Sequence, residues 1–308
     1  MKLAALLLAS MLSAGAAAQD AVPEPRNRFA ATEAAVERFE VGALAVERHG
    51  KRGRPLILIP GLASGSWVWQ DAIRTFRDDH VLYVVTLPGF DGRAPAPGNQ
   101  LEATQAALAQ LISSRKLGKP VLVGHSMGGT IALELAQNHP DLIGGVVTID
   151  GLPVFPGTED MPAEQRPALA DGIIRRMSGL TPAAFAMQQR QYMRSIDVVD
   201  MARADELAKL TSRSDPAATV QYMAAVMSQD LRPGLGKIKA PVLVMAPFFE
   251  LDANDPNAGL DNKVAYYAQL LSGAPTVNVV GIPGARHFAM IDQPQRVTDA
   301  IRSFLKSL

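Results

Sequence analysis

Residues 121–130 of the chain read VLVGHSMGGT, and this stretch decides the fold. A short apolar run ends at Gly124, and a serine follows two positions later, before a helical pattern that starts at Thr130. A serine held in a sharp turn between a strand and a helix needs glycine on both sides, because a Cβ at Gly124 or Gly128 would clash with the tight backbone. The spacing predicts a strand, a strained turn and a helix, with the Ser126 hydroxyl raised above the end of the strand.

Short apolar runs and amphipathic stretches alternate over most of the chain. Strands that are apolar on both faces, separated by helices, are typical of a parallel sheet covered on both sides. The expected strands are 39–47, 56–59, 81–85, 121–123, 146–149, 242–246 and 276–282, and the expected helices are 66–77, 101–114, 130–139, 264–271 and 298–305. The predicted fold class is α/β, with a mostly parallel, doubly wound sheet that binds its ligands at the carboxyl ends of the strands.

One long stretch interrupts this alternation. Residues 153–236 contain helical segments, several prolines and no convincing strand, and they hold seven of the chain's twelve methionines. We interpret them as a helical lid inserted between two parts of a core, residues 19–152 and residues 237–308. The methionines either form the adaptable wall of a substrate pocket or fill gaps in a small helical cap.

The composition excludes several classes of function. Hydrophobic side chains make up 48% of the chain, which is typical of a globular protein. Thirty basic residues balance thirty acidic ones without a basic cluster, so nucleic acid is not an expected partner. The absence of cysteine excludes disulfides, thiolate nucleophiles and cysteine-bound metals. We expect neither a metal nor a cofactor.

The first eighteen residues have the features of a cleavable signal peptide. Lys2 precedes a short apolar run at 3–12, and small residues at 16–18 come directly before Gln19. The apolar run is far shorter than the roughly 20 residues that span a bilayer, so no stable membrane span is expected. This pattern predicts a periplasmic or secreted protein that begins at Gln19.

A serine nucleophile needs a histidine as its general base, and the chain has five histidines. His49, His80 and His139 are expected at the surface, and His125 is expected to pack in the interior beside the serine. His287 lies in the segment GARHF, just beyond the last expected strand, where a short loop gives it the reach to face the serine. His287 is therefore the candidate base.

The histidine in turn needs a carboxylate to hold its second ring nitrogen, and the order serine, acid, histidine along the chain places this acid before residue 287. Asp252 is the first choice, because it follows the expected strand 242–246 within reach of the histidine. Asp150, at the end of the expected strand 146–149, is the main alternative. Glu250 and Asp255 also stay open.

Two backbone amides are candidates for stabilising a developing oxyanion. The amide of Met127 lies at the start of the helix that follows the serine. A glycine-rich turn, PGLASG at 60–65, follows the expected strand 56–59, and Leu62 is its most suitable donor unless the turn is an ordinary loop. Trp67, directly after this turn, is expected to pack under the sheet, as is Trp69.

Taken together, these motifs resemble the α/β-hydrolase superfamily over about residues 39–308. The segments that carry the resemblance are PG at 60–61, LPGF at 87–90, GHSMGG at 124–129 and GARHF at 284–288. Thr86 and Arg286 depart from the family pattern, which usually has aspartate and glycine there, and Pro60 stands where many relatives have histidine.

The resemblance implies the serine branch of the superfamily, with a lid, a triad of Ser126, His287 and an acid, and an oxyanion hole from Leu62 and Met127. The expected activity is cleavage of a small or medium apolar carboxylic ester through an acyl-enzyme on Ser126. An acyltransferase, an amidase or a C–C bond hydrolase of the same fold stays open. A non-catalytic protein that binds a small molecule is the alternative from another class, suggested by Arg286 and the long loop that carries the acid.

Overall fold

The computed structural model describes residues 29, 33–253 and 259–308, and all structural statements below concern these residues. The predicted signal peptide, residues 1–18, lies outside them and stays a prediction. So does the candidate acid Asp255.

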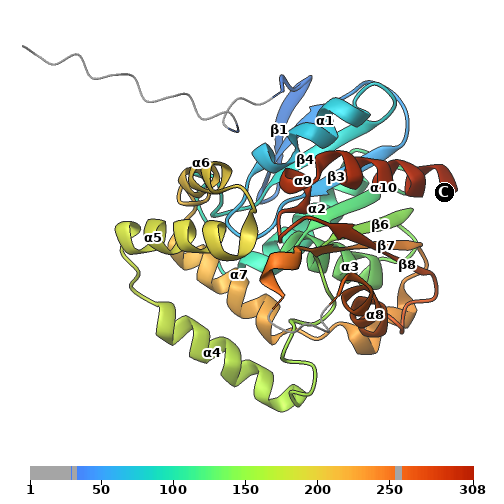
Figure 1. Ribbon diagram of the computed structural model, residues 1–308. Coiled ribbons are helices and arrows are strands. Elements are labelled where there is room, and N and C mark those ends of the chain that lie inside the picture. Colours follow the sequence, from blue (N-terminus) through green and yellow to red (C-terminus); the bar gives the residue numbers. More distant parts are fainter. Residues whose placement is uncertain (1–28, 30–32, 254–258) are drawn as a thin grey trace, which may run out of the picture.

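Eight strands form one sheet in the order β1-β2-β4-β3-β5-β6-β7-β8 (Figure 1). The pairs β1–β2 and β2–β4 are antiparallel, and all the other pairs are parallel. The strands are β1 (Glu37–Val41), β2 (Leu44–His49), β3 (Pro55–Ile59), β4 (Val81–Thr86), β5 (Val121–His125), β6 (Gly145–Ile149), β7 (Val242–Phe248) and β8 (Val277–Pro283).

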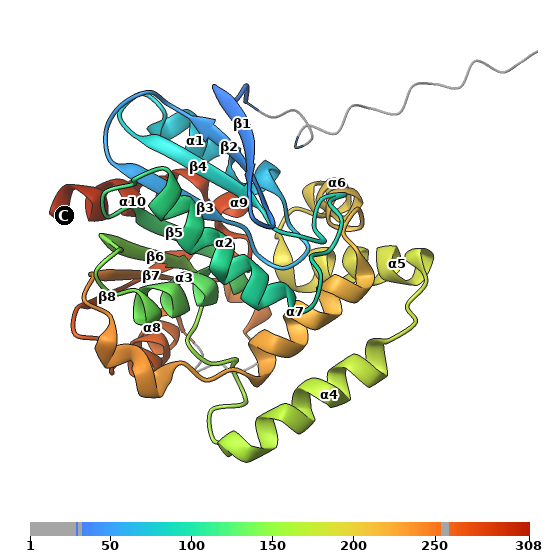
Figure 2. The same cartoon turned by 180° about the vertical axis from the view of Figure 1, so that it is seen from behind.

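Helices cover both faces of this sheet (Figures 1 and 2). One face is covered by α2 (Gln100–Ser114), α3 (Met127–Asn138) and α8 (Leu260–Leu270), and the other by α1 (Gln70–Phe76), α9 (Ala289–Asp292) and α10 (Pro294–Ser307). Alternate residues of one strand serve the two layers: Ile57 and Ile59 pack in the first, and Leu56 and Leu58 in the second. The predicted α/β fold with a mostly parallel sheet is confirmed.

The amino-terminal edge of the sheet differs from the prediction. The single strand expected at 39–47 is a hairpin of β1 and β2, and the chain reverses at Gly42, whose φ is +52°. A period-two pattern continues through such a short turn, because the turn leaves the alternation of the side chains almost unchanged. The expected packing of the tryptophans agrees with the structure, since Trp67 and Trp69 of η1 (Ser66–Trp69) are buried under the sheet.

Residues 153–236 lie between β6 and β7 and form mainly helices, which we call the insertion. Its helical segments are η2 (Ala163–Gln165), α4 (Arg166–Met177), α5 (Pro182–Tyr192), the π-helical turn η3 (Met193–Asp197), α6 (Met201–Thr211), α7 (Pro216–Ser228) and η4 (Arg232–Lys237). The helices α4 to α7 lie together beyond one end of the sheet in both views, whereas η4 packs against α3 of the core (Figures 1 and 2). That the insertion acts as a lid or cap over the core stays a prediction.

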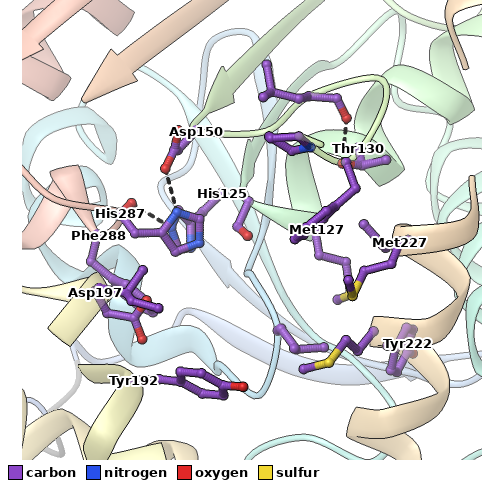
Figure 3. A pocket seen from close by; sticks show the side chains of 18 of the residues that line it. His125, Met127, Thr130, Asp150, Tyr192, Asp197, Tyr222, Met227, His287 and Phe288 are labelled. Carbon is purple, nitrogen blue, oxygen red and sulfur yellow. Dashed lines mark hydrogen bonds and ion pairs between the residues drawn. The ribbon is translucent and has the colours of Figure 1, made fainter. Parts of the chain in front are cut away.

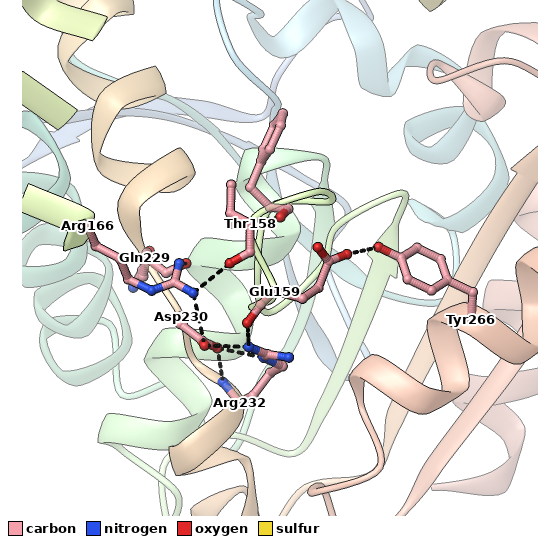
Figure 4. Close-up of polar contacts among 8 residues, drawn as sticks. Thr158, Glu159, Arg166, Gln229, Asp230, Arg232 and Tyr266 are labelled. Atoms are coloured by element: carbon pink, nitrogen blue, oxygen red, sulfur yellow. Dashed lines mark hydrogen bonds and ion pairs between the residues drawn. The ribbon is translucent and has the colours of Figure 1, made fainter. Parts of the chain in front are cut away.

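A polar network fastens the two ends of the insertion to each other (Figure 4). The Asp230 carboxylate lies 3.3 Å from the guanidinium of Arg166, near the start of the insertion, and 2.8 Å from that of Arg232, near its end. Tyr266 of α8 donates a hydrogen bond to Glu159. These contacts join the base of the insertion to itself and to the core.

Candidate active site

Ser126 lies in the turn between β5 and α3 with φ +52° and ψ −123°. Residues other than glycine rarely adopt this backbone conformation. The glycines on both sides of it are required by close approach. A Cβ on Gly124 would lie 2.2 Å from the carbonyl oxygen of Gly128, and a Cβ on Gly128 would lie 2.3 Å from that of Ile59. The Ser126 hydroxyl has no hydrogen-bond partner among the described residues, and its side chain lines a cavity.

His287 lines the same cavity and pairs with Asp150 (Figure 3). The distance from His287 Nδ1 to Asp150 Oδ2 is 2.5 Å, and Tyr267 of α8 donates a hydrogen bond to the other carboxylate oxygen. Both oxygens of Asp150 are therefore engaged, so the carboxylate is held in one orientation. With Nδ1 occupied, Nε2 is the nitrogen that is left for a proton transfer.

The expectation that Asp252 holds the histidine is wrong. Asp252 forms a two-bond ion pair with Arg286, with distances of 2.7 Å from Nε and from Nη2. The strand order explains the difference: β6, which carries Asp150 at its end, is the neighbour of β5, whereas β7 is one strand further from the serine. Glu250, another alternative, lies exposed in the short turn η5 (Glu250–Asp252).

The backbone at Asp150 resembles that at Ser126. Asp150 also has a positive φ, +54°, and its amide donates to the carbonyl of Met245 on β7. Aspartate tolerates this region better than most residues, because its short polar side chain can bond locally. The sequence signal for this conformation was the pair Asp150-Gly151 directly after an apolar run.

The pair is electrostatically coupled. Burial alone would raise the pKa of Asp150, but the hydrogen bond and the charge of His287 outweigh it, so the pKa lies below the ordinary value. Burial would lower the pKa of His287, but the hydrogen bond to Asp150 and the charge of that carboxylate leave it raised. Asp150 is thus a carboxylate at neutral pH and supports a positive charge on the imidazole.

The two candidate oxyanion donors also lie at this cavity. Leu62 and Met127 line it, and their amide N–H groups donate to no other group in the described part of the chain. Met127 is the first residue of α3, so the partial positive charge of the helix N-terminus adds to its amide. The geometry leaves both amides available to an oxygen that develops negative charge.

The sequence matches the model of a known protein family. The model described as "Alpha/beta hydrolase family" matches residues 56–300, which is most of the chain. The chain belongs to the alpha/beta hydrolase family.

Individual relatives of this hydrolase are distant. It is 24% identical over 270 residues to a pimeloyl-(acyl-carrier protein) methyl ester esterase of Aeromonas hydrophila. The matched region covers 85% of this chain and 99% of that protein. Among solved structures it is similar to a thermophilic esterase from Thermogutta terrifontis, with a TM-score of 0.67, 23% identity and coverage of 88% and 98%. A bromoperoxidase from Bacillus anthracis gives a TM-score of 0.71 at 19% identity, with coverage of 88% and 100%. These structures share the fold, and the predicted class of enzyme, an α/β-hydrolase of the carboxylesterase type, agrees with the names of the esterase relatives.

The segment that carries the base is bonded to the insertion. The amides of His287 and Phe288 donate to the carbonyls of Ile196 and Asp197, at 3.4 and 2.8 Å. The Arg286 guanidinium donates to the carbonyls of Arg194 and Val198, at 3.0 and 3.1 Å. Arg286, one of the departures from the family pattern, therefore ties residues 194–198 of the insertion to the loop that carries His287. We call this contact the loop seam.

The other histidines are not candidates for the base, and His125 contacts the backbone of His287 instead. His125 is completely buried, and its Nε2 lies 3.0 Å from the carbonyl oxygen of His287. Burial lowers the pKa of His125 to about 3, so the ring is neutral and supports the backbone of the base. The expectation of a surface position was wrong for His49, which is buried beside Glu47, whereas His139 is exposed.

The cavity has a volume of about 570 Å³ and lies between the strand ends and the insertion. Its walls differ (Figure 3): His287, Asp197 and Tyr192 lie on one side, and Met127 and Met227 on the other. Four of the seven methionines of the insertion line it, namely Met177, Met193, Met223 and Met227. This placement agrees with the pocket-wall interpretation for these four, while Met187 is 74% exposed.

Two contributors to the site were not found from the sequence. Tyr267 comes from α8, and Asp197 comes from η3 in the insertion. Neither belongs to a local motif, so only the folded chain brings them to the cavity. In the described ranges no group of three or more histidine, aspartate or glutamate side chains could hold a metal ion, and no helix is long and apolar enough to cross a membrane.

Proposed function

We propose that this hydrolase cleaves small or medium carboxylic esters with an apolar acyl part, through an acyl-enzyme on Ser126. The observation that carries the proposal is the 2.5 Å contact of His287 Nδ1 with Asp150, at a cavity lined by a serine whose backbone is strained. The esterase names of the sequence relatives support the same reaction class.

In the first half of the reaction His287 Nε2 takes the proton of the Ser126 hydroxyl while Oγ attacks the ester carbonyl carbon. Asp150 holds the Nδ1 proton and stabilises the imidazolium that forms. The amides of Leu62 and Met127 bind the negative oxygen of the tetrahedral intermediate. The C–O bond to the alcohol then breaks, and His287 gives its proton to the leaving oxygen.

In the second half a water molecule replaces the alcohol. His287 Nε2 takes one proton from the water, and the water oxygen attacks the acyl carbon. The bond to Ser126 Oγ breaks, the serine regains the proton from His287, and the carboxylic acid leaves. Four methionine side chains of the insertion offer an adaptable apolar wall for the acyl chain.

The proposal includes export. It is supported by the charged residue Lys2, the apolar run at 3–12 and the small residues at 16–18. When the full chain is produced in a bacterial host, N-terminal sequencing of the protein from the periplasm or the medium should begin at Gln19. An unprocessed protein that stays in the cytoplasm would contradict export without touching the proposed reaction.

The reaction is tested with a fluorophosphonate probe and a series of p-nitrophenyl esters of increasing acyl length. Wild type should take one label and hydrolyse the esters, and Ser126→Ala should take none and lose roughly 10⁴-fold or more in kcat. Ser195→Ala is the matched control, because Ser195 is an exposed serine of the insertion. Labelling of Ser195→Ala must equal that of wild type, and turnover retained by Ser126→Ala would refute the proposal.

A further inference from the structure

A second carboxylate faces the cavity and takes no part in the proposed mechanism. Asp197 ends the π-helical turn η3, and Figure 3 shows its side chain between His287 and Tyr192. The carbonyl of Asp197 is fixed by the amide of Phe288 at 2.8 Å, within the loop seam. Its carboxylate, in contrast, has no hydrogen bond and no ion pair among the described residues.

The environment does not offset the charge of this side chain. Burial raises the pKa of Asp197, the charge of Asp150 raises it further, and only the charge of His287 lowers it. Other carboxylates near the site are fully engaged: Asp252 pairs with Arg286, and Asp292 accepts hydrogen bonds from the amides of Val199 and Arg286. Asp197 is half-buried, and its carboxylate lines the cavity without contributing a hydrogen bond or an ion pair to the described part of the fold.

The position of Asp197 indicates which part of a substrate its carboxylate would contact. His287 must hand its proton to the leaving oxygen of the ester, so the alcohol part lies on the side of the base. Asp197 lies on that side, whereas Met127 and Met227 line the opposite wall (Figure 3). The cavity therefore has the Asp197 carboxylate on the side where the alcohol part would lie and methionine side chains on the side where the acyl chain would lie.

We propose that Asp197 binds a protonated amine on the alcohol part of the substrate, so that esters of amino alcohols are the preferred class. The inference deepens the proposed ester hydrolysis and rests on it for the assignment of the two sides. A cation compensates an unpaired carboxylate more strongly than a neutral donor does, which favours an ammonium over a hydroxyl. Arg176 also lines the cavity, but it is exposed and is not among the groups that act on Asp197.

Two esters of equal shape test this specificity. 2-(Dimethylamino)ethyl butanoate carries a positive charge at pH 7, and 3-methylbutyl butanoate has a carbon in place of the nitrogen. Wild type should favour the amino ester in kcat/KM by roughly tenfold to a hundredfold, mainly through KM, since a charge-assisted hydrogen bond contributes on that order. Asp197→Asn should lower kcat/KM for the amino ester far more than for the neutral ester, so that the preference disappears.

A matched variant controls for the change of charge. Asp171→Asn removes one negative charge from an exposed position on α4 of the same insertion. It should keep the full preference of wild type for the amino ester. Equal fluorophosphonate labelling and equal melting temperatures of the three proteins show that each is folded and has an active serine.

Several results would overturn the proposal. One is a wild type without preference for the amino ester, and another is an Asp197→Asn variant that keeps the preference. An equal loss on both esters, with a displaced pH profile, would mean that Asp197 acts only on the basicity of His287, and this too refutes the role in recognition.

Binding without turnover separates this inference from the proposed reaction. Calorimetry on Ser126→Ala should show tighter binding of the amino ester than of its neutral match, and the added Asp197→Asn change should remove the difference. If wild type hydrolyses neither ester but this binding difference is present, the reaction is wrong and the recognition by Asp197 stands. Equal binding of the two esters refutes the recognition whatever the enzyme hydrolyses.

Discussion

Two neighbouring strands of the sheet each lead to an aspartate, and both aspartates pair with the same short loop. Asp150 follows β6 and binds His287, and Asp252 follows β7 and binds Arg286, the residue before it. The side chain of Asp150 is 12% exposed, and that of Asp252 is 42% exposed. A charge pair shielded from water alters the chemistry of its partner, whereas an exposed pair is screened and adds little.

The backbone accounts for this difference. Asp150 comes directly after its strand in a left-handed conformation, which turns the side chain toward the neighbouring loop. Asp252 comes four residues after the end of β7, in a 3₁₀ turn on the outside of the site. The distance of each aspartate from its strand end, and the position of that strand in the sheet, therefore decide which carboxylate reaches the base.

Removal of the buried carboxylate should have the largest effect. We expect Asp150→Asn to lower kcat by roughly 10³ to 10⁴-fold, because the imidazole loses the charge and the acceptor that orient it. The pKa of His287 should fall as well, because Asp150 raises it in wild type. The neutral base then persists to lower pH, so the acidic limb of the kcat/KM profile should move to lower pH.

Asp252→Asn is the matched control for this variant, and it should change kcat less than about twofold. Hydrolysis of p-nitrophenyl butanoate measured from pH 4 to 9 gives both kcat and the position of the acidic limb of the kcat/KM profile. A comparable loss of activity in the two variants would abolish the distinction between the two aspartates.

Loss of the Tyr267 hydroxyl should have a smaller effect. Tyr267→Phe removes the donor to one oxygen of Asp150. We expect kcat to fall by roughly threefold to thirtyfold, which is less than a hydrogen bond to a charge can contribute, because Asp150 keeps its bond to His287. Without this donor the carboxylate attracts the imidazolium more strongly, so the acidic limb should move slightly to higher pH, opposite to the shift in Asp150→Asn.

The neighbouring tyrosine provides the control. Tyr266 lies on the same helix but donates to Glu159 of the insertion, so Tyr266→Phe should leave the pH profile unchanged. A role of Tyr267 in packing alone would lower the stability of Tyr267→Phe and leave its pH profile unchanged.

Loss of the Asp252–Arg286 ion pair should have the smallest effect, and it should change the stability alone. Asp252→Asn should lower the free energy of unfolding by at most about 1 kcal/mol, because water reaches the half-exposed Asp252 carboxylate and screens the pair. Urea denaturation at low salt measures the difference, and about 0.5 M NaCl should reduce it further. A loss that exceeds this range and resists salt would show that the Asp252–Arg286 pair is more than a surface contact.

Ser126 could be predicted from the sequence because its requirements are local. The strand, the two glycines and the helix lie within a few residues, and each close contact involves the turn itself or the adjacent β3. His287 could be predicted as well, since a loop after the last strand has few alternatives. The sheet followed from the apolar runs for the same reason, except at the hairpin near Gly42.

The remaining parts of the site depend on contacts between distant segments. The choice between Asp150 and Asp252 depends on the strand order and on a left-handed residue, neither of which a periodic pattern reports. Tyr267 and Asp197 reach the cavity from a helix and from the insertion, more than a hundred and about seventy residues after the serine. Such partners have no signature of their own in the sequence.

The loop seam limits the ways in which a molecule can enter the cavity. A swing of the whole insertion away from the sheet would break the hydrogen bonds from residues 286–288 to residues 194–198 and would displace the imidazole with them. The α4 end of the insertion has no such bonds to the loop that carries His287 within the described residues, although Ile173 and Met177 line the cavity there. An opening beside Ile173 and Met177 would leave the hydrogen bonds of residues 286–288 intact, so the imidazole would keep its position while a molecule enters.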